Sequence, residues 1–185
     1  MPSHRLPRHG RLALPTQTRA PAVTGLERFN SVRADDVERA LLTCCRSLRW
    51  AHRVADHRPY PNLDALLAAS DEAAYDLAPA DLAEALAGES LTLLPDGAYS
   101  VAHTALSAAH AAYESRFGHV FVICLDNAPP GEALDQVLAG IRSRLTNDRE
   151  EERVLAAEEL RRLARGRLAR LVRDFSPRPA LQRTP

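Results

Sequence analysis

Residues 157–175 read AEELRRLARGRLARLVRDF, and this stretch decides the fold class. Its apolar side chains recur at spacings of three and four over about five turns, which is the period of an amphipathic α-helix. One face of this helix is therefore expected to be buried, and the opposite face to carry arginines. The apolar stripe consists of Ala157, Leu160, Ala164, Leu168, Leu171 and Phe175.

Two arginines of this helix flank the apolar stripe. At 100° per residue, Arg161 and Arg167 lie about 60° from its centre, where a guanidinium could lean into a pocket and grip a carboxylate with two hydrogen bonds. The simpler alternative is that both lie at the rim of the core with their charged ends in water. The remaining arginines point away from the stripe and are expected on the solvated face: Arg162, Arg165, Arg170 and Arg173.

The same helical period recurs over most of the chain. Caps at Ser47 and Asn62, and Pro79 at a first helical position, indicate where helices begin. We predict an all-α fold, a single-domain bundle of six to eight helices over residues 25–175, with residues 1–24 as a disordered basic leader and 176–185 as a disordered tail. The expected segments are 33–45, 47–58, 62–77, 79–87, 101–117, 132–145 and the helix that ends at 175, with a loop over 88–99.

One run, Val120-Phe121-Val122-Ile123-Cys124-Leu125, looks like a β-strand. No second β-rich run is present to pair with it, and a lone strand leaves its backbone groups unsatisfied. We therefore expect this run to be buried extended chain or the start of a helix.

Composition removes several function classes. All 24 basic residues are arginines, so lysine-based Schiff-base or phosphate-loop chemistry is excluded. The 24 acidic residues bring the net charge to zero, which argues against a nucleic-acid binder over the whole chain. The ends are basic, however: residues 1–24 carry four Arg and no acid, and residues 161–185 carry eight Arg and one acid. Nucleic-acid contact through these ends remains an unfavoured alternative.

The cysteines, the histidines and the lack of catalytic motifs limit the possible location and chemistry of the protein further. The three cysteines have no CxxC spacing, which favours a reducing interior and a cytoplasmic location, and no apolar run is long enough for a membrane helix. The histidine spacings fit no zinc motif, so no metal is expected. No nucleophile elbow or glycine-rich phosphate loop occurs, and Cys124 is interpreted as a small hydrophobic residue rather than a nucleophile.

Several short strings, in order along the chain, carry a family resemblance. They are Phe29-Asn30, CCRSLRWA at 44–51, Arg58-Pro59-Tyr60, LLAASD at 66–71, DLAEA at 81–85, AYESRFGHVF at 112–121, RLTND at 144–148 followed by Glu151 and Glu152, and EEL at 158–160 running on to Arg167-Leu168. Together they resemble the 2-oxo-4-hydroxy-4-carboxy-5-ureidoimidazoline (OHCU) decarboxylases of urate breakdown, over residues 26–173.

This resemblance implies an all-helical, cofactor-free enzyme, usually a homodimer, that binds a small ureido-imidazoline. It releases carbon dioxide from OHCU and protonates the remaining carbanion on one face, giving S-allantoin. Such chemistry needs a grip on substrate oxygens and a placed proton donor. By the resemblance, the backbone of Phe121, Val122, Ile123, Cys124 and Leu125 holds the ring, and Arg167 matches a late arginine that meets an anionic group.

The donor motif of the family does not match. The family has a His-Pro-Arg-Ile-Gly string where this chain has Glu89-Ser90-Leu91, and its Ser-x-x-Glu-Gln string has no clear counterpart. Glu89 is then the candidate donor, Ser100 is a weak candidate for substrate binding, and His103 is a speculative substitute donor. Two functions follow from the same sequence: a decarboxylase with a rearranged donor, or an inactive homologue that keeps the fold to bind a partner or a related ureide.

Overall fold

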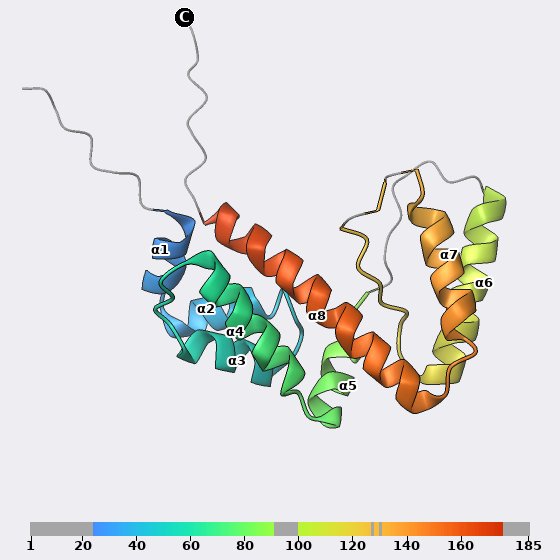
Figure 1. Cartoon of the computed structure of the whole chain (residues 1–185), viewed down its shortest axis with the longest axis horizontal. Helices are drawn as coiled ribbons and strands as arrows, with labels where there is room; N and C mark the ends of the chain where they lie inside the picture. Colours follow the sequence, from blue (N-terminus) through green and yellow to red (C-terminus); the bar gives the residue numbers. More distant parts are fainter. Residues whose placement is uncertain (1–23, 91–99, 127, 130, 176–185) are drawn as a thin grey trace, which may run out of the picture.

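The structure is a computed structural model that describes residues 24–90, 100–126, 128–129 and 131–175; of residues 100–103 it describes the backbone alone. Within these ranges the chain forms eight α-helices and no β-strand (Figure 1). This confirms the predicted all-α class. The helices are α1 (Gly25–Ser31), α2 (Ala34–Leu41), α3 (Leu48–Asp56), α4 (Leu63–Tyr75), α5 (Pro79–Ala87), α6 (Ser100–Phe117), α7 (Ala133–Arg144) and α8 (Arg149–Asp174).

Helix α8 is the central element. Its 26 residues give a rod of about 39 Å, and it crosses the molecule diagonally in Figure 1. Both α1 and α4 pack against it. The buried face follows one row at every fourth residue, so the predicted stripe was right at its centre, whereas Ala157, Leu171 and Phe175 are only half-buried at its edge. The buried row is Glu152, Ala156, Leu160, Ala164, Leu168 and Val172.

Side-chain caps fix where several helices begin. Ser47 and Asn62 accept hydrogen bonds from the backbone of Trp50 and Ala65, as their positions in the sequence predicted. Asp148 caps α8 together with Glu151, so this helix begins two turns before the apolar stripe from which it was predicted. Helix α1 was not expected, because seven residues are too few to show a period. Its signal is the capping box that Thr24 forms with Glu27.

The apolar side chains form two separate hydrophobic clusters. The larger cluster lies between α1–α5 and α8, and includes Phe29, Trp50 and Leu168. The smaller one joins α6 and α7 around Tyr113, Phe121 and Ile141. In Figure 1 the α6–α7 pair lies well apart from α1–α4, with α8 running between them. Helix α8 contributes apolar side chains to the larger cluster over most of its length.

The strand-like run is extended chain without a β-partner, one of the two predicted outcomes. Helix α6 ends at Phe117, and the next residue, Gly118, has a φ of 82°, a conformation that favours glycine. Residues 120–125 follow, with Phe121 and Val122 buried. Side chains satisfy its backbone instead of a neighbouring strand. Arg144 donates to the carbonyl of Val122 over 2.7 Å, and the carboxylate of Glu159 accepts from the amide of Cys124 over 2.7 Å.

A buried ion pair joins α7 to the first turn of α8. The Arg144 guanidinium donates through Nε (2.8 Å) and Nη2 (2.5 Å) to Oε1 of Glu152, whose side chain is 1% exposed. The hydroxyl of Tyr113 from α6 donates to the same oxygen. The guanidinium also stacks on Phe121, 4.6 Å from the ring centre. The strings at 112–121 and 144–152 that carried the family resemblance therefore build one structural network.

Two further strings dock against each other at the start of the fold. Asn30 exchanges two 2.9 Å hydrogen bonds with the backbone of Tyr60, and Arg58 donates to the carbonyls of Phe29 and Val32. The string at 44–51 supplies Trp50, whose indole N–H reaches the carbonyl of Ser70 in α4. No helix within the described residues is long and apolar enough to cross a membrane.

We predict that Glu152→Ala lowers the free energy of unfolding by about 3–5 kcal/mol, because it leaves the Arg144 charge buried without a partner. Urea unfolding followed by circular dichroism measures the change. Glu151→Ala is the matched control, since this neighbouring carboxylate is exposed and makes only the reciprocal capping contact. Equal losses for the two variants would contradict the assignment.

His110 gives a prediction about pH. Burial lowers the pKa of His110 below 6.5, its Nδ1 has no hydrogen-bond partner, and Glu114 is the nearby charge that opposes the shift. Because the unfolded chain then binds the proton more readily, this residue lowers stability as pH falls through 6.5. His110→Leu is expected to lose less stability than the wild type between pH 7.5 and pH 5.5, measured by urea unfolding.

His52 is the control of opposite sign. Its contacts with Glu38 and Asp56 raise its pKa, so its contribution is present at low pH and disappears as pH rises. His52→Gln should therefore lose more stability than the wild type over the same fall in pH. Parallel behaviour of the two variants would overturn both assignments.

Candidate functional site

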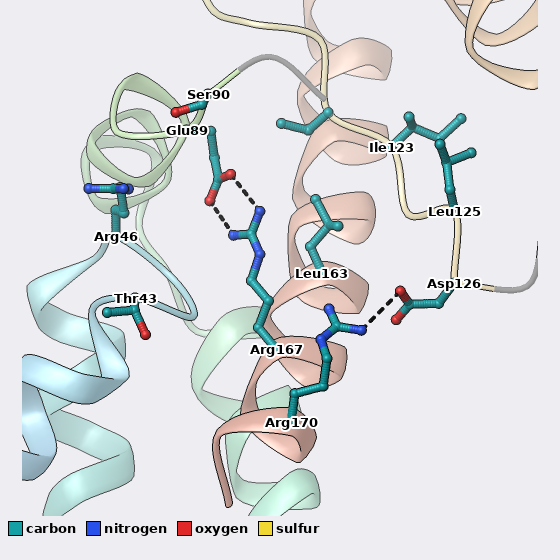
Figure 2. A pocket seen from close by; sticks show the side chains of 11 residues that line it. Thr43, Arg46, Glu89, Ser90, Ile123, Leu125, Asp126, Leu163, Arg167 and Arg170 are labelled. Carbon is teal, nitrogen blue, oxygen red and sulfur yellow. Dashed lines mark hydrogen bonds and ion pairs between the residues drawn. The ribbon is translucent and has the colours of Figure 1, made fainter. Parts of the chain in front are cut away.

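A pocket of about 510 Å³ opens beside the C-terminal half of α8 (Figure 2). Four parts of the chain line it: α8, the α2–α3 connection, the segment after α5, and the extended run. The pocket thus lies between the elements that build the larger cluster and the extended run, which leads to the smaller cluster. Its lining is Thr43, Arg46, Glu89, Ser90, Val122, Ile123, Leu125, Asp126, Leu163, Arg167 and Arg170.

The centre of this pocket is a two-point ion pair. Arg167 donates through Nη1 to Oε1 of Glu89 over 2.7 Å and through Nη2 to Oε2 over 2.9 Å, as Figure 2 shows. The Glu89 side chain is 4% exposed and that of Arg167 is 30% exposed. Parallel N–H···O bonds of this kind fix both groups in one plane. The pocket therefore presents a carboxylate and a guanidinium that are already matched.

The surroundings of Arg167 keep it charged and keep the nearby thiols neutral. Its Nη1 also donates to the carbonyl of Cys44 over 3.1 Å, and the hydrogen bond to Glu89 raises the pKa of Arg167. Burial raises the pKa of Cys44 to about 11 and that of Cys45 to about 12. Since the thiolate is the nucleophile, neither cysteine is activated for covalent chemistry.

A second ion pair lies at the outer side of the pocket. Arg170 donates to Asp126 over 3.3 Å, and both side chains are about half exposed. The Asp126 carboxylate lies directly over Gly166, where an added Cβ would collide with its Oδ2. Arg46 is exposed at the rim and has no carboxylate partner among the described residues. Arg170 is exposed, as the sequence pattern predicted, and it also lines the outer side of the pocket.

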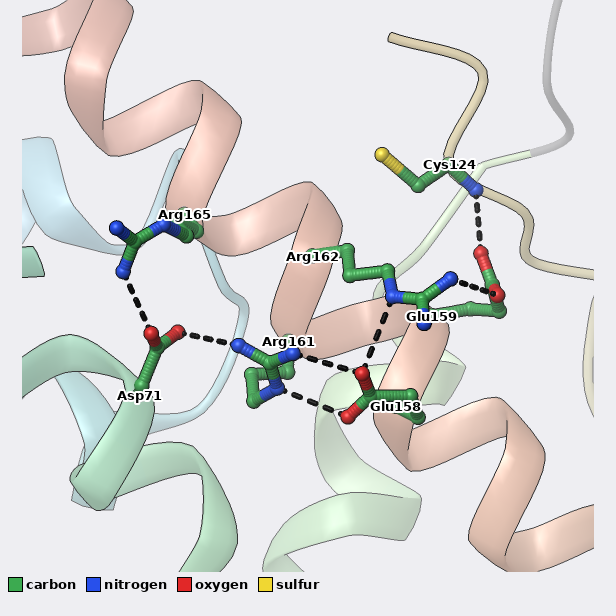
Figure 3. Close-up of polar contacts among 7 residues, drawn as sticks. All are labelled: Asp71, Cys124, Glu158, Glu159, Arg161, Arg162 and Arg165. Carbon is green, nitrogen blue, oxygen red and sulfur yellow. Dashed lines mark hydrogen bonds and ion pairs between the residues drawn. The ribbon is translucent and has the colours of Figure 1, made fainter. Parts of the chain in front are cut away.

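The extended wall of the pocket is held by a chain of charged side chains along α8 (Figure 3). Glu159 accepts from the Cys124 amide and from Arg162, and Arg162 also contacts Glu158. Glu158 binds Arg161 in turn, and Arg161 reaches Asp71 of α4 over 2.8 Å. Arg161, one of the two arginines that flank the apolar stripe, therefore belongs to an ion-pair network and not to the pocket.

The structure brings together most of the residues singled out from the sequence. Glu89, Arg167, Val122, Ile123 and Leu125 all line the one pocket. Phe121 and Cys124 do not: the Phe121 ring lies in the smaller cluster, and the Cys124 amide is taken by Glu159. Ser100 and His103 belong to α6, but their side chains lie outside what the structure describes.

Sequence reasoning missed several pocket residues. Thr43, Arg46 and Asp126 lie in connections, where no helical period assigns a direction to a side chain. Glu159 was seen only as part of a string, although its place eight residues before Arg167 puts both on one side of α8. That spacing is the signal that could have found it.

The described residues contain no group of three His, Cys, Asp or Glu side chains arranged to hold a metal ion. What the pocket offers is a fixed cation, two carboxylates and the backbone of the extended wall. Ile123 lines the pocket and makes no backbone hydrogen bond within the described part of the chain. Hydrogen-bond donors and acceptors arranged in this way suit a small polar molecule.

Comparisons with known proteins identify the fold and the family of the chain. The family profile described as OHCU decarboxylase matches residues 30–90 and 92–169. A crystal structure of (S)-allantoin synthase superimposes with a TM-score of 0.64 at 19% identity, covering 80% of this chain and 53% of that one. This chain therefore spans about half the length of that synthase.

A second crystal structure, of OHCU decarboxylase in the presence of (S)-allantoin, gives a TM-score of 0.63 at 18% identity and covers 76% of this chain and 99% of that one. A search of curated proteins gives no match. At these identities the superpositions establish the fold, whereas the profile covers most of the sequence. The chain belongs to the OHCU decarboxylase family.

Proposed function

We propose that this protein decarboxylates OHCU to S-allantoin without a cofactor, and that the reaction takes place in the pocket of Arg167. The observation that carries the proposal is the convergence of Arg167, the Glu89 carboxyl group and the 122–125 wall in one cavity. The resemblance points to Arg167 and the wall, and the required chemistry adds a proton donor, for which Glu89 is the candidate. A wide separation of the same groups would have argued for a protein without a reaction site.

The reaction moves negative charge from one part of the substrate to another. As the C–C bond breaks, carbon dioxide leaves as a neutral molecule and the electron pair stays on the ring carbon, delocalised onto a neighbouring oxygen or nitrogen. Arg167 stabilises that developing charge from a largely buried position. The backbone of Ile123 orients the ring. A proton delivered to one face of the carbon then completes S-allantoin.

Glu89 is the candidate for that last step, because it occupies the position of the family histidine. A carboxyl group that donates a proton must first hold one, and a carboxylate bound at two points to a guanidinium does not. Glu89 therefore acts as donor only after its contact with Arg167 has opened and its carboxylate has taken up a proton from water. His103, in the first turn of α6, stays a further candidate for the donor.

The remaining expectations follow the same proposal. The enzyme is expected to act in urate degradation, in the cytoplasm, and as a homodimer. The three free cysteines support a reducing compartment. Size-exclusion chromatography with light scattering measures the oligomeric state.

A second candidate is an inactive homologue that binds a ureide or another partner. One observation favours it: the protein's own Glu89 occupies the Arg167 fork, where an enzyme of this kind would bind substrate. Turnover distinguishes the two candidates.

We predict that the pure protein forms S-allantoin from freshly generated OHCU faster than the spontaneous reaction does, followed by circular dichroism. Arg167→Gln should reduce this rate by about 100-fold, because it removes the fixed charge that faces the developing anion. Arg173→Gln, an exposed arginine on the same helix, is the matched control and should leave the rate unchanged. A wild-type rate equal to the spontaneous one would favour the inactive homologue.

We also predict a positioning role for Glu159. Glu159→Ala releases the Cys124 amide, and the resulting shift of the wall should lower kcat/KM on the order of tenfold to a hundredfold. Glu159→Gln keeps an oxygen that accepts this hydrogen bond and should restore most of the activity. Glu158→Gln, whose carboxylate contacts Arg161 and Arg162 rather than the wall, is the control. Equal effects of Ala and Gln at 159 would rule out the role.

A further inference from the structure

We propose that Glu89 makes the pocket selective for a neutral ureide group over a carboxylate at Arg167. The inference deepens the proposed function, from which it takes the ureide class of ligand, and it identifies Glu89 as a determinant of specificity. It rests on the geometry of the Glu89–Arg167 pair, not on the donor role. The pair has no net charge, and it is the innermost polar feature of the pocket.

The hydrogen-bonding capacity of Arg167 is only partly used. Nη1 gives one hydrogen to Glu89 and one to the carbonyl of Cys44, so it is saturated. Nη2 gives one hydrogen to Glu89 and keeps a second, and Nε–H has no partner within the described residues. One edge of the guanidinium therefore remains available, and it can donate two parallel hydrogen bonds to an acceptor.

Glu89 complements that free edge. Each carboxylate oxygen accepts one hydrogen bond from Arg167 and has capacity for another. The pair thus presents N–H donors and carboxylate acceptors side by side. A ureide group has the complementary set, a carbonyl oxygen that accepts and N–H groups that donate. A ligand carboxylate on the same edge would satisfy the donors but would lie against the negative charge of Glu89, with which it shares one cation.

The charges around this pair support the same selectivity. The other pocket carboxylate, Asp126, is bound to Arg170, and Arg46 stands exposed at the rim. A carboxylate could be received at Arg46, where solvent screening weakens the interaction. At the buried end of the pocket, the only guanidinium among the described lining residues is already neutralised.

This selectivity also suits decarboxylation. The carboxylate that leaves becomes neutral carbon dioxide, so an ion pair to that carboxylate stabilises the reactant more than the transition state. While it is paired with Arg167, Glu89 withholds such an ion pair from the substrate carboxylate; the pair opens only after carbon dioxide has left, when Glu89 serves as proton donor. The ureide arm of the same substrate is then the group that anchors at the pair, and the carboxylate lies free to leave.

The test is a binding titration with two small probes that carry one group each: methylurea, a neutral ureide, and acetate, a carboxylate. Followed by NMR line shifts, the wild type should bind methylurea at least tenfold more tightly than acetate. Glu89→Gln keeps the shape and removes the charge, so it should gain at least tenfold for the carboxylate probe and lose the preference. Asp126→Asn makes the same change of charge elsewhere in the pocket and should keep the wild-type preference.

A second measurement guards against a misfolded variant. Glu89→Ala empties the Arg167 fork, and added acetate should fill it and raise the unfolding midpoint of this variant but not of the wild type. Equal binding of both probes to the wild type, or an unchanged preference in Glu89→Gln, would overturn the inference. Failure of OHCU turnover with the probe preference intact would count against the proposed function alone.

Discussion

The buried pair of Arg144 and Glu152 is the contact on which the other parts of this structure depend. It lies where three helices meet: Tyr113 arrives from α6, Arg144 ends α7, and Glu152 belongs to the first turn of α8. Two ions without water are costly to bury, and only a nearly complete set of hydrogen bonds makes their burial tolerable. The guanidinium here also donates to the Tyr113 hydroxyl and to the carbonyl of Val122. Helix packing and the course of the extended wall are therefore set by one side chain.

The pocket follows from this arrangement. The wall at 122–125 is neither helix nor strand, and it keeps its course because Arg144 and Glu159 hold its backbone from α7 and α8. Across from it, Arg167 projects from the same long helix toward Glu89. One rigid rod therefore positions the wall and the charged centre together. A site built on a helix in this way retains its geometry better than one built from loops alone.

The fold class and most helix starts could be predicted from the sequence, because caps and the helical period are local signals. Ser47, Asn62 and Pro79 each marked a helix start correctly. The short helix α1 was missed because its seven residues leave no room for a period, although its capping box was present in the sequence. The family resemblance came from strings whose residues turn out to hold the structure together, such as Arg144 and Asn30.

The site was harder to predict for a physical reason. Arg161 and Arg167 flank the apolar stripe in the same way on a helical wheel, yet Arg161 pairs with Asp71 and only Arg167 enters the pocket. What separates them is the element that packs on each side of α8, and that is information from tertiary structure. Likewise, nothing local in the sequence indicates that Glu89 meets Arg167 across 78 residues.

The extended wall has a consequence for how relatives of this chain are compared. Its course is held by side chains that lie outside it, on α7 and α8, so the backbone keeps its path when the less buried wall residues change, although Val122 is buried and must keep its size. A relative with different wall residues but the same Arg and Glu at the positions of 144 and 159 would preserve the shape of the cavity. A relative that keeps the wall sequence but loses either anchor residue would not preserve the shape of the cavity. When relatives in this fold are compared, the anchor residues are therefore a better guide to a shared function than the residues that a ligand touches.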